Sequence, residues 1–280
     1  MKYEAYFKTF LTAIEKQLQK VLPPQQQFPP VLHEAMRYAV FTGGKRFRPV
    51  LTLASCEAAG GKWEDALIPA AAIELIHAYS LVHDDLPALD NDDFRRGQPT
   101  CHKRFGEAMA ILAGDGLLNL AFHILSLPKP ATRAIALLEE ISTAAGTYGM
   151  IGGQVADMTA SPNLSLPMID YISTHKTGKL IKASSVSGGI VAGVSKKKLG
   201  YITKYGEFLG LAFQTVDDLQ DGDGYLRIAK PEEMRQKVRD LISQAKDQIR
   251  QLGLKTKKLE ALADFLLERM PKTNHVAMDR

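Results

Sequence analysis

Apolar residues recur at helical spacing along most of the chain, whereas the alternation typical of β-strands is convincing nowhere. The segments with the helical pattern are 2–21, 31–42, 49–60, 64–83, 106–126, 131–150, 180–195, 204–221 and two helices within 231–271. Prolines between positions 23 and 30 separate the first two helices, and Gly43-Gly44 is a typical helix stop. The pattern therefore predicts an all-α protein, without repeats or low-complexity tracts.

Length, charge and cysteine content narrow the class of protein. The 280 residues are 45% apolar, which is enough for one large domain or two small ones. The formal net charge of +4 comes without a basic block, so nucleic acid is not the favoured partner, while small phosphate-bearing molecules remain open. Cys56 and Cys101 lack metal-type spacing, which fits a reducing compartment.

The N-terminus and the apolar segments bear on localisation. The first residues are amphipathic and carry acids, unlike a signal peptide, and we find no apolar run of transmembrane length. We therefore expect a soluble cytoplasmic protein that binds neither nucleic acid nor a membrane.

The stretch 83–100 concentrates charged side chains. Five carboxylates lie between Asp84 and Asp93, and Arg95 and Arg96 follow at once. Like charges at such short range repel each other, and a divalent cation resolves the repulsion. Mg²⁺ prefers hard oxygen ligands and is often held by carboxylates together with substrate phosphates. The two arginines are then candidates to grip diphosphate oxygens, although a solvated acidic loop is the plain alternative.

A proline shapes this acidic stretch. Pro87 should end or kink the helix that carries Asp84. On a straight helix Asp84 and Asp90 would point apart, so joint binding of one cation requires Asp90 to turn back. His77 lies two turns before Asp84 on the same helix face. A lone histidine is more often structural, but this position also supports a role in substrate binding.

Two other segments place cations beside small residues. In 43–49, Lys45 and Arg48 share a face if the segment is a helical turn, and the preceding glycines allow close approach of an anion. Lys176 and Thr177 place an ammonium beside a hydroxyl. Either pair fits a phosphate site. The alternative for Lys45 and Arg48 is a basic loop cap, and the alternative for Lys176 and Thr177 is a solvated helix end.

A second acidic cluster lies on the helix predicted for 204–221. Its members follow an i, i+3, i+4, i+7 stripe on a helix that is otherwise apolar: Gln214, Asp217, Asp218 and Asp221. Burying unpaired charge is expensive, so this stripe requires a cation or a basic partner. The two acidic clusters could face each other across a cavity.

The ordered set of motifs resembles the bacterial-type short-chain trans-prenyltransferases. Residues 84–90 with 95–97 match the first aspartate-rich motif of that family, and 217–221 matches its second, DDxxD. The other motifs also occur in the same order along the chain as in the family: residues 43–49, His77, Gly153-Gln154 and Lys176-Thr177. Within the family the resemblance is closest to the farnesyl diphosphate synthases. It implies an isoprenoid synthase-type bundle of long helices around a deep central cavity, as a single domain over 1–280 and usually a homodimer.

The resemblance also implies residue roles. Mg²⁺ ligands, for three ions per site, would be Asp84, Asp85, Asp90, Asp217 and Asp221. Contacts to the allylic diphosphate would be Arg95, Lys176, Thr177 and Gln214, and contacts to isopentenyl diphosphate would be Lys45, Arg48, His77 and Arg96. The residues expected to carry catalysis are Asp84, Asp85, Asp90, Arg95, Lys176 and Asp217.

The activity implied is a Mg²⁺-dependent condensation of isopentenyl diphosphate with dimethylallyl or geranyl diphosphate. The allylic C–O bond ionises, and the isopentenyl double bond attacks the carbocation. Product length is expected to depend on bulk just before Asp84. Tyr79 favours a short product such as C15 farnesyl diphosphate, and Ser80 is small. The short product could also be C10.

One departure from the family pattern lies after Asp221. The family has a longer loop there, with lysines that reach the allylic diphosphate, and this loop looks deleted here. Lys230 is a candidate replacement. The alternatives are a geranyl or geranylgeranyl diphosphate synthase, a terpene cyclase, a catalytically impaired regulatory subunit and a plain helical scaffold. The isopentenyl contacts argue against a cyclase, and the two acidic clusters argue against a scaffold.

Overall fold

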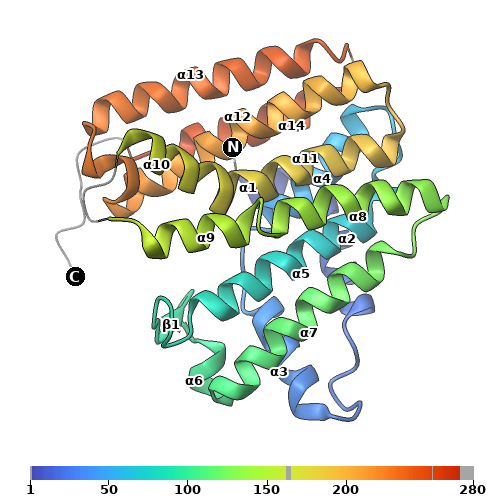
Figure 1. The fold of residues 1–280 in the computed structure, drawn as a ribbon. Coiled ribbons are helices and arrows are strands. Elements are labelled where there is room, and N and C mark those ends of the chain that lie inside the picture. Colours follow the sequence, from blue (N-terminus) through green and yellow to red (C-terminus); the bar gives the residue numbers. More distant parts are fainter. Residues whose placement is uncertain (1, 162–164, 254, 272–280) are drawn as a thin grey trace. The chain divides into compact units, whose positions relative to one another are not determined.

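The computed structural model describes residues 2–161, 165–253 and 255–271. The chain divides into two compact units, and each is described by itself (Figure 1). The N-terminal unit comprises 2–50 and 67–138, and the C-terminal unit comprises 51–66 and the described residues from 139 onward.

The N-terminal unit is built around α5. Its helices are α1 (Tyr3–Tyr6), α2 (Lys8–Val21), α3 (Pro30–Phe41), α5 (Leu67–Asp84), α6 (Cys101–Phe105) and α7 (Glu107–Leu125), and α4 (Phe47–Ala58) begins here. Helix α5 packs against α2, α3 and α7 and buries side chains on nearly every face. Gly114 of α7 lies so close to His83 that an added Cβ would be 2.1 Å from the imidazole Nε2. A glycine at this position therefore allows α7 to pack closely against the end of α5.

The C-terminal unit is built around α12. Besides the rest of α4, its elements are η1 (Trp63–Ala66), the end of α8 (Ala131–Ala145), α9 (Met150–Thr159), α10 (Leu166–Ile172), the π-helical turn η2 (Ser173–Gly178), α11 (Lys179–Ala192), α12 (Lys196–Asp221), η3 (Gly224–Arg227), α13 (Pro231–Arg250) and α14 (Lys257–Arg269). Helix α12 packs against α11, α13 and α14, and α13 runs alongside it in Figure 1. The glycines of α11 allow close packing here too, because a Cβ on Gly188 would lie 2.5 Å from the Thr52 carbonyl oxygen.

The all-α prediction is confirmed, with three local corrections. The helix expected over 2–21 is interrupted at Phe7, whose buried ring packs against the Tyr3 and Phe10 rings. The helix expected over 131–150 ends at Ala145, and the chain turns before α9 begins at Met150; in this turn a Cβ on Gly149 would lie 2.0 Å from the Ala144 carbonyl oxygen.

The third correction is a short hairpin that the sequence pattern did not indicate. Strand β1 (Phe94–Arg95) pairs antiparallel with β2 (Gln98–Pro99). Arg96 and Gly97 form the turn with φ values of 54° and 74°, the left-handed geometry of tight hairpin turns. Strands of two residues are too short to show an alternating pattern.

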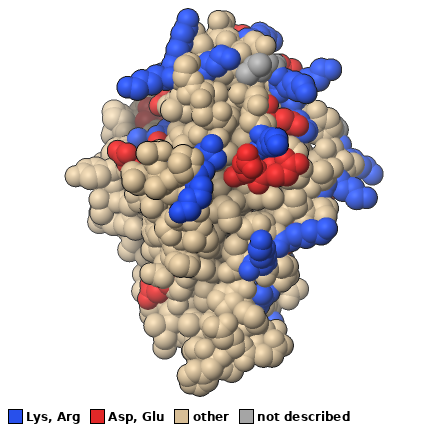
Figure 2. Space-filling model, turned by 90° about the vertical axis from the view of Figure 1, so that its right-hand side faces the viewer, with Lys and Arg blue, Asp and Glu red and all other residues tan. Residues whose placement is uncertain are grey.

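Two described helical segments, Trp63–Asp84 and Glu107–Leu125, could cross a membrane judged by length and composition alone. The expectation that no apolar stretch has that length therefore does not hold. Core helices of soluble proteins meet the same criterion, and 67% of the most apolar stretch of the first segment and 39% of that of the second are buried inside the protein. On the face drawn in Figure 2, Lys and Arg side chains are dispersed among uncharged and acidic residues, in keeping with the modest net charge of +4.

Candidate active site

The first aspartate motif begins where α5 ends. The helix stops at Asp84, three residues before Pro87, as predicted. The Asp90 backbone N–H then donates to the Asp84 carbonyl oxygen at 2.8 Å. The predicted return of Asp90 toward Asp84 is thus confirmed for the backbone.

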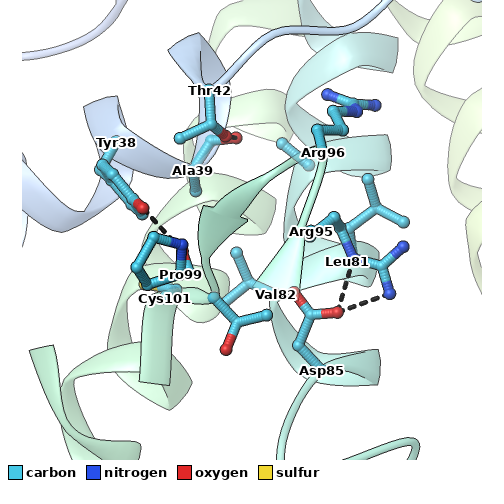
Figure 3. Close-up of a pocket in the computed structure, with 12 residues that line it drawn as sticks. Tyr38, Ala39, Thr42, Leu81, Val82, Asp85, Arg95, Arg96, Pro99 and Cys101 are labelled. Atoms are coloured by element: carbon cyan, nitrogen blue, oxygen red, sulfur yellow. Dashed lines mark hydrogen bonds and ion pairs between the residues drawn. The ribbon is translucent and has the colours of Figure 1, made fainter. Parts of the chain in front are cut away.

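Within this motif, Asp85 is held by an arginine of the hairpin. Arg95 approaches one carboxylate oxygen of Asp85 with Nε at 2.6 Å and Nη2 at 2.5 Å, and its Nη2 also contacts Asp92 at 3.1 Å (Figure 3). Asp85 is only 3% exposed, and this burial raises its pKa, although Arg95 acts in the opposite direction. Arg95, predicted to bind the allylic diphosphate, therefore neutralises a predicted metal ligand in this structure.

A small pocket lies beside this ion pair. Its volume is about 30 Å³, and Tyr38, Asp85, Arg95, Arg96 and Thr100 are among its lining residues (Figure 3). A hydrogen bond holds the hairpin beside this pocket: the Tyr38 hydroxyl donates to the Pro99 carbonyl oxygen at 2.6 Å. A cavity of this size holds roughly two water molecules and is too small for a diphosphate.

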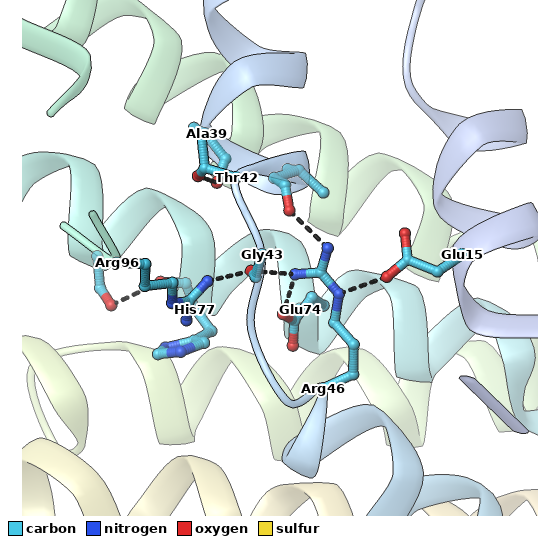
Figure 4. A network of polar contacts seen from close by, with 10 residues as sticks. Glu15, Ala39, Thr42, Gly43, Arg46, Glu74, His77 and Arg96 are labelled. Carbon is cyan, nitrogen blue, oxygen red and sulfur yellow. Dashed lines mark hydrogen bonds and ion pairs between the residues drawn. The ribbon is translucent and has the colours of Figure 1, made fainter. Parts of the chain in front are cut away.

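The predicted isopentenyl contacts gather around the Gly43-Gly44 segment. Arg96 donates to the Gly43 carbonyl oxygen, and a Cβ on Gly44 would lie 2.6 Å from the Arg96 Nη1 (Figure 4). Burial keeps the pKa of His77 well below its ordinary value, and the charges of Arg48 and Arg96 lower it further. His77, Arg48 and Arg96 therefore act on one another electrostatically, whereas the Lys45 side chain is exposed.

Sequence reasoning missed Arg46, which is the buried cation of this segment. It is 6% exposed and forms ion pairs with Glu74 at 2.8 Å and Glu15 at 2.7 Å. The available signal was Glu74, an acid within the otherwise apolar stretch of α5, which needed a basic partner.

In the C-terminal unit, Lys176 lies on the π-helical turn η2. Its ammonium contacts the Asp157 carboxylate at 2.7 Å. Gly153 makes this approach of α9 to η2 possible, since a Cβ there would lie 2.1 Å from the Lys176 backbone nitrogen. Thr177 follows on the same turn and is half-buried. Single π-helical turns are frequent at functional sites.

The acids of α12 have distinct environments. Asp217 accepts a hydrogen bond from Arg269 at 2.9 Å, and Asp221 is exposed. Asp218 is buried and accepts from the Gln214 side-chain amide at 2.7 Å, and burial raises the pKa of this carboxyl group. Gln214, a predicted diphosphate contact, thus bonds to an acid here.

The connection after Asp221 is short and tightly held. The Tyr225 backbone N–H donates to the Asp218 carboxylate at 3.0 Å, and Gly224, with φ 59°, has no room for a Cβ beside that carboxylate. The fully buried Tyr225 donates its hydroxyl hydrogen bond to Asp170, and the Lys237 ammonium lies 3.6 Å from the Tyr225 ring centroid. Asp218 therefore serves the fold of the connection.

The donor set suits magnesium, although the described residues include no group of three or more acids, histidines or cysteines arranged around one point. Carboxylate oxygens are the ligands Mg²⁺ prefers. Asp85 and Asp217 each hold an arginine, so both carboxylates already bind a cationic partner in this structure. The chemistry of these acids therefore fits the predicted ion, and their roles as ligands stay predictions.

The fold and motifs define an all-helical enzyme of prenyl diphosphate chemistry. The polyprenyl synthetase family matches residues 29–249, and the chain belongs to that family. Farnesyl diphosphate synthase of Escherichia coli (strain K12) is 43% identical over 277 residues, covering 89% of this chain and 92% of that protein. The chain is therefore a trans-prenyltransferase, as the resemblance implied.

Other relatives differ in the product that their names state. Geranylgeranyl diphosphate synthase of Cyanophora paradoxa is 37% identical over 280 residues, covering 91% of this chain and 93% of the relative. The solved structure of an FPP/GFPP synthase from Zymomonas mobilis matches with a TM-score of 0.89 and 35% identity, covering 95% of this chain and 98% of that chain.

Proposed function

We propose that the chain condenses isopentenyl diphosphate with dimethylallyl or geranyl diphosphate and releases farnesyl diphosphate. The family supports the reaction class, and the similarity to the Escherichia coli farnesyl diphosphate synthase supports the C15 product.

The observation that carries the product length is the position of Tyr79, about one turn before Asp84 on α5. Its ring is 5% exposed and meets the His83 ring edge-on, with centroids 5.7 Å apart. Burial and the nearby Asp84 raise the pKa of Tyr79 to about 12, so the phenol is uncharged at neutral pH. A bulky neutral ring at this place would stop a growing prenyl chain, whereas Ser80 would not.

The proposed Mg²⁺ ligands are Asp84, Asp85, Asp90, Asp217 and Asp221. When bound, Mg²⁺ stabilises the negative charge that develops on the leaving diphosphate. Arg95, which holds Asp85 in this structure, is proposed to turn to the allylic diphosphate together with Lys176, Thr177 and Gln214.

The proposed chemistry needs no nucleophilic side chain. The allylic C–O bond breaks, and its electron pair leaves with the diphosphate. The isopentenyl double bond then forms the new C–C bond to the allylic carbon, which leaves a cation on the isopentenyl unit. A C–H bond beside this cation breaks, its electron pair forms the new double bond, and the proton passes to the departing diphosphate. Lys45, Arg48 and Arg96 are proposed to bind isopentenyl diphosphate by charge. His77 is neutral at pH 7 because its pKa is low, so it would contribute a hydrogen bond.

The test is incubation with Mg²⁺, isopentenyl diphosphate and either dimethylallyl or geranyl diphosphate, with products sized by chain length. We expect a C15 product that Asp84→Ala and Asp217→Ala each abolish. A C20 product would refute the role of Tyr79, and a C10 product would replace farnesyl with geranyl diphosphate as the product. A product that survives both substitutions would refute the two aspartate motifs as the site.

The short connection after Asp221 supports a second candidate function, a catalytically impaired subunit that modulates a partner synthase. Lys230, the candidate replacement cation, lies exposed at the N-cap of α13, where its backbone N–H donates to Glu233 at 3.4 Å. A folded protein that forms no product from either allylic starter would favour this candidate.

A homodimer and a cytoplasmic location belong to the same proposal. Ile111 and Leu112 on α7 are 45% and 53% exposed, and a second copy of the chain would cover such apolar side chains. Size measurement in solution tests the dimer.

A further inference from the structure

Arg46 is the one cation of the segment 45–48 to which the proposed function gives no role. Its neighbours Lys45 and Arg48 are proposed to bind isopentenyl diphosphate, whereas the Arg46 side chain points into the N-terminal unit (Figure 4). Its φ of 50° is uncommon for a residue with a side chain. Strong contacts must therefore hold this conformation.

Those contacts come from two helices and from the backbone. The guanidinium pairs with Glu74 of α5 at 2.8 Å and with Glu15 of α2 at 2.7 Å. It also donates to the Val40 carbonyl oxygen at 2.7 Å and to the Gly43 carbonyl oxygen at 3.3 Å. One buried side chain thus ties the end of α3 and the glycine segment to two other helices (Figure 4).

The backbone of the segment needs such an anchor. Gly43 and Gly44 have φ values of 102° and 125°, so the chain leaves helical geometry directly after α3. The last carbonyls of a helix have no partner within the helix, and Arg46 supplies one for Val40. The Gly43 carbonyl oxygen also accepts from Arg96, itself a proposed substrate contact that would leave when it binds diphosphate. Arg46 would then remain as the fixed donor.

The anchor also sets the segment relative to α5. Glu74 lies three residues before His77, so both side chains lie on neighbouring positions of one helix face. A guanidinium fixed on Glu74 therefore determines how far the segment carrying Lys45 and Arg48 lies from His77.

We infer that Arg46, held by Glu15 and Glu74, is a positioning residue for the isopentenyl diphosphate site. It keeps Lys45, Arg48 and His77 in the arrangement that binds this diphosphate, and it does not touch the substrate. The inference rests on the proposed function. It also gives α2 a role, although Glu15 lies before residue 29, where the family match begins.

Steady-state kinetics of four variants test this inference. Glu15→Gln and Arg46→Lys weaken the anchor, and Arg48→Gln removes a proposed substrate contact. Arg37→Gln is the matched control, because Arg37 also fastens helices of this unit, through Gln19 and the Pro23 carbonyl oxygen, but contacts no part of 43–48. Thermal unfolding of each variant shows whether it is folded.

We expect KM for isopentenyl diphosphate to rise about threefold in Glu15→Gln and about tenfold in Arg46→Lys, because bonds to a charged group are weakened. KM for geranyl diphosphate and kcat should stay within about twofold of the parent protein in both, since a positioning defect reaches only one substrate. Arg37→Gln should lower thermal stability without moving either KM. Because the Glu15 side chain is 42% exposed, Glu15→Gln should fold and decides the question if Arg46→Lys does not.

Arg48→Gln separates failure of the inference from failure of the proposed site. If Arg48→Gln raises KM for isopentenyl diphosphate but the two anchor variants behave like Arg37→Gln, the positioning role is wrong. If the anchor variants change both KM values equally, Arg46 is structural only. If Arg48→Gln leaves KM unchanged, the isopentenyl site itself is wrong and the positioning role fails with it.

Discussion

The two aspartate motifs differ in how the protein holds their acids. At the end of α5, Asp85 is paired with Arg95, ten residues away along the chain. At the end of α12, Asp217 is paired with Arg269, which is 52 residues away on α14. The first motif is a local structure closed by a hairpin, whereas the second depends on a distant helix.

The neighbouring acids differ as well. In the first motif the chain returns through a backbone hydrogen bond, which the Asp90 N–H donates to the Asp84 carbonyl oxygen. In the second motif the Asp218 carboxylate itself holds the connection by accepting the Tyr225 N–H. One acid of the second motif is therefore committed to the fold, and the other two, Asp217 and Asp221, are the ones proposed as metal ligands.

The largest expected effect is a difference in kcat/KM between variants of Arg95 and Arg269, the arginines that pair with the two motifs. Arg95→Gln should lower kcat/KM for geranyl diphosphate about a hundredfold, because Arg95 is proposed to bind that diphosphate. Arg269→Gln should change kcat/KM less than about threefold, and the Mg²⁺ concentration for half-maximal activity should fall, since Asp217 loses a competing cation. Initial rates at varied geranyl diphosphate and Mg²⁺ measure both.

Arg250→Gln is the control for both variants, because this exposed arginine of α13 pairs with Asp247 at 2.7 Å, three residues away on its own helix. Equal losses in Arg95→Gln and Arg269→Gln would contradict the distinction between a substrate-binding arginine and a structural one.

The next effect concerns stability of the second motif. Asp218→Ala should lower the free energy of unfolding by about 2 kcal/mol, because the buried Tyr225 N–H and the Gln214 amide lose their acceptor. Asp217→Ala should cost less than about 1 kcal/mol, since its ion pair is partly exposed. Urea unfolding measures both, and Asp218→Asn, which keeps an acceptor oxygen, should fall between them. A loss in Asp217→Ala as large as that in Asp218→Ala would show that both acids hold the connection.

Local features of the site were predictable from sequence. Pro87 was expected to end α5, and joint binding of one cation by Asp84 and Asp90 required the chain to turn back, which the backbone does. The stripe on α12 was expected to need a cation or a basic partner, and Arg269 is a basic partner of Asp217.

The remaining features depend on contacts between residues that are distant in sequence. No pattern near Asp217 indicates Arg269, because the two meet only when α14 packs on α12. Burial of Arg46 beside two exposed or half-buried cations follows from where Glu15 and Glu74 lie after folding. The π-helical turn at Lys176 had no sequence signal either, since it arises where Gly153 lets α9 approach η2.

A smaller effect is expected from His77, beside the first motif. Its pKa is lowered in the folded protein, so at pH above about 6.5 it is neutral in both the folded and unfolded chains. As the pH falls through that value, the unfolded chain takes up a proton and the folded one does not. The free energy of unfolding should then fall by up to about 1.4 kcal/mol per pH unit from this group.

Unfolding in urea at pH 5.5 and 7.5 measures the slope. His77→Asn should show a shallower decrease than the parent protein between these values. The same slope in both proteins would mean that His77 takes up its proton in the folded state.

The smallest expected effect concerns Lys230, the candidate replacement for the lysines of the family loop that is predicted to be deleted after Asp221. Its side chain is exposed at the N-cap of α13, and its backbone N–H bonds to Glu233, a contact that substitution of the side chain preserves. Arg227 lies closer to the second motif in the chain, but it is paired with Asp223 within the connection.

Lys230→Ala should therefore change KM for geranyl diphosphate less than about twofold, as a surface substitution does. Initial rates at varied geranyl diphosphate decide the point. Lys204→Ala on α12 is the control, because Lys204 is also exposed and pairs with Glu207, three residues away on the same helix. A rise in KM of tenfold or more in Lys230→Ala alone would show that this lysine reaches the allylic diphosphate despite the shortened connection.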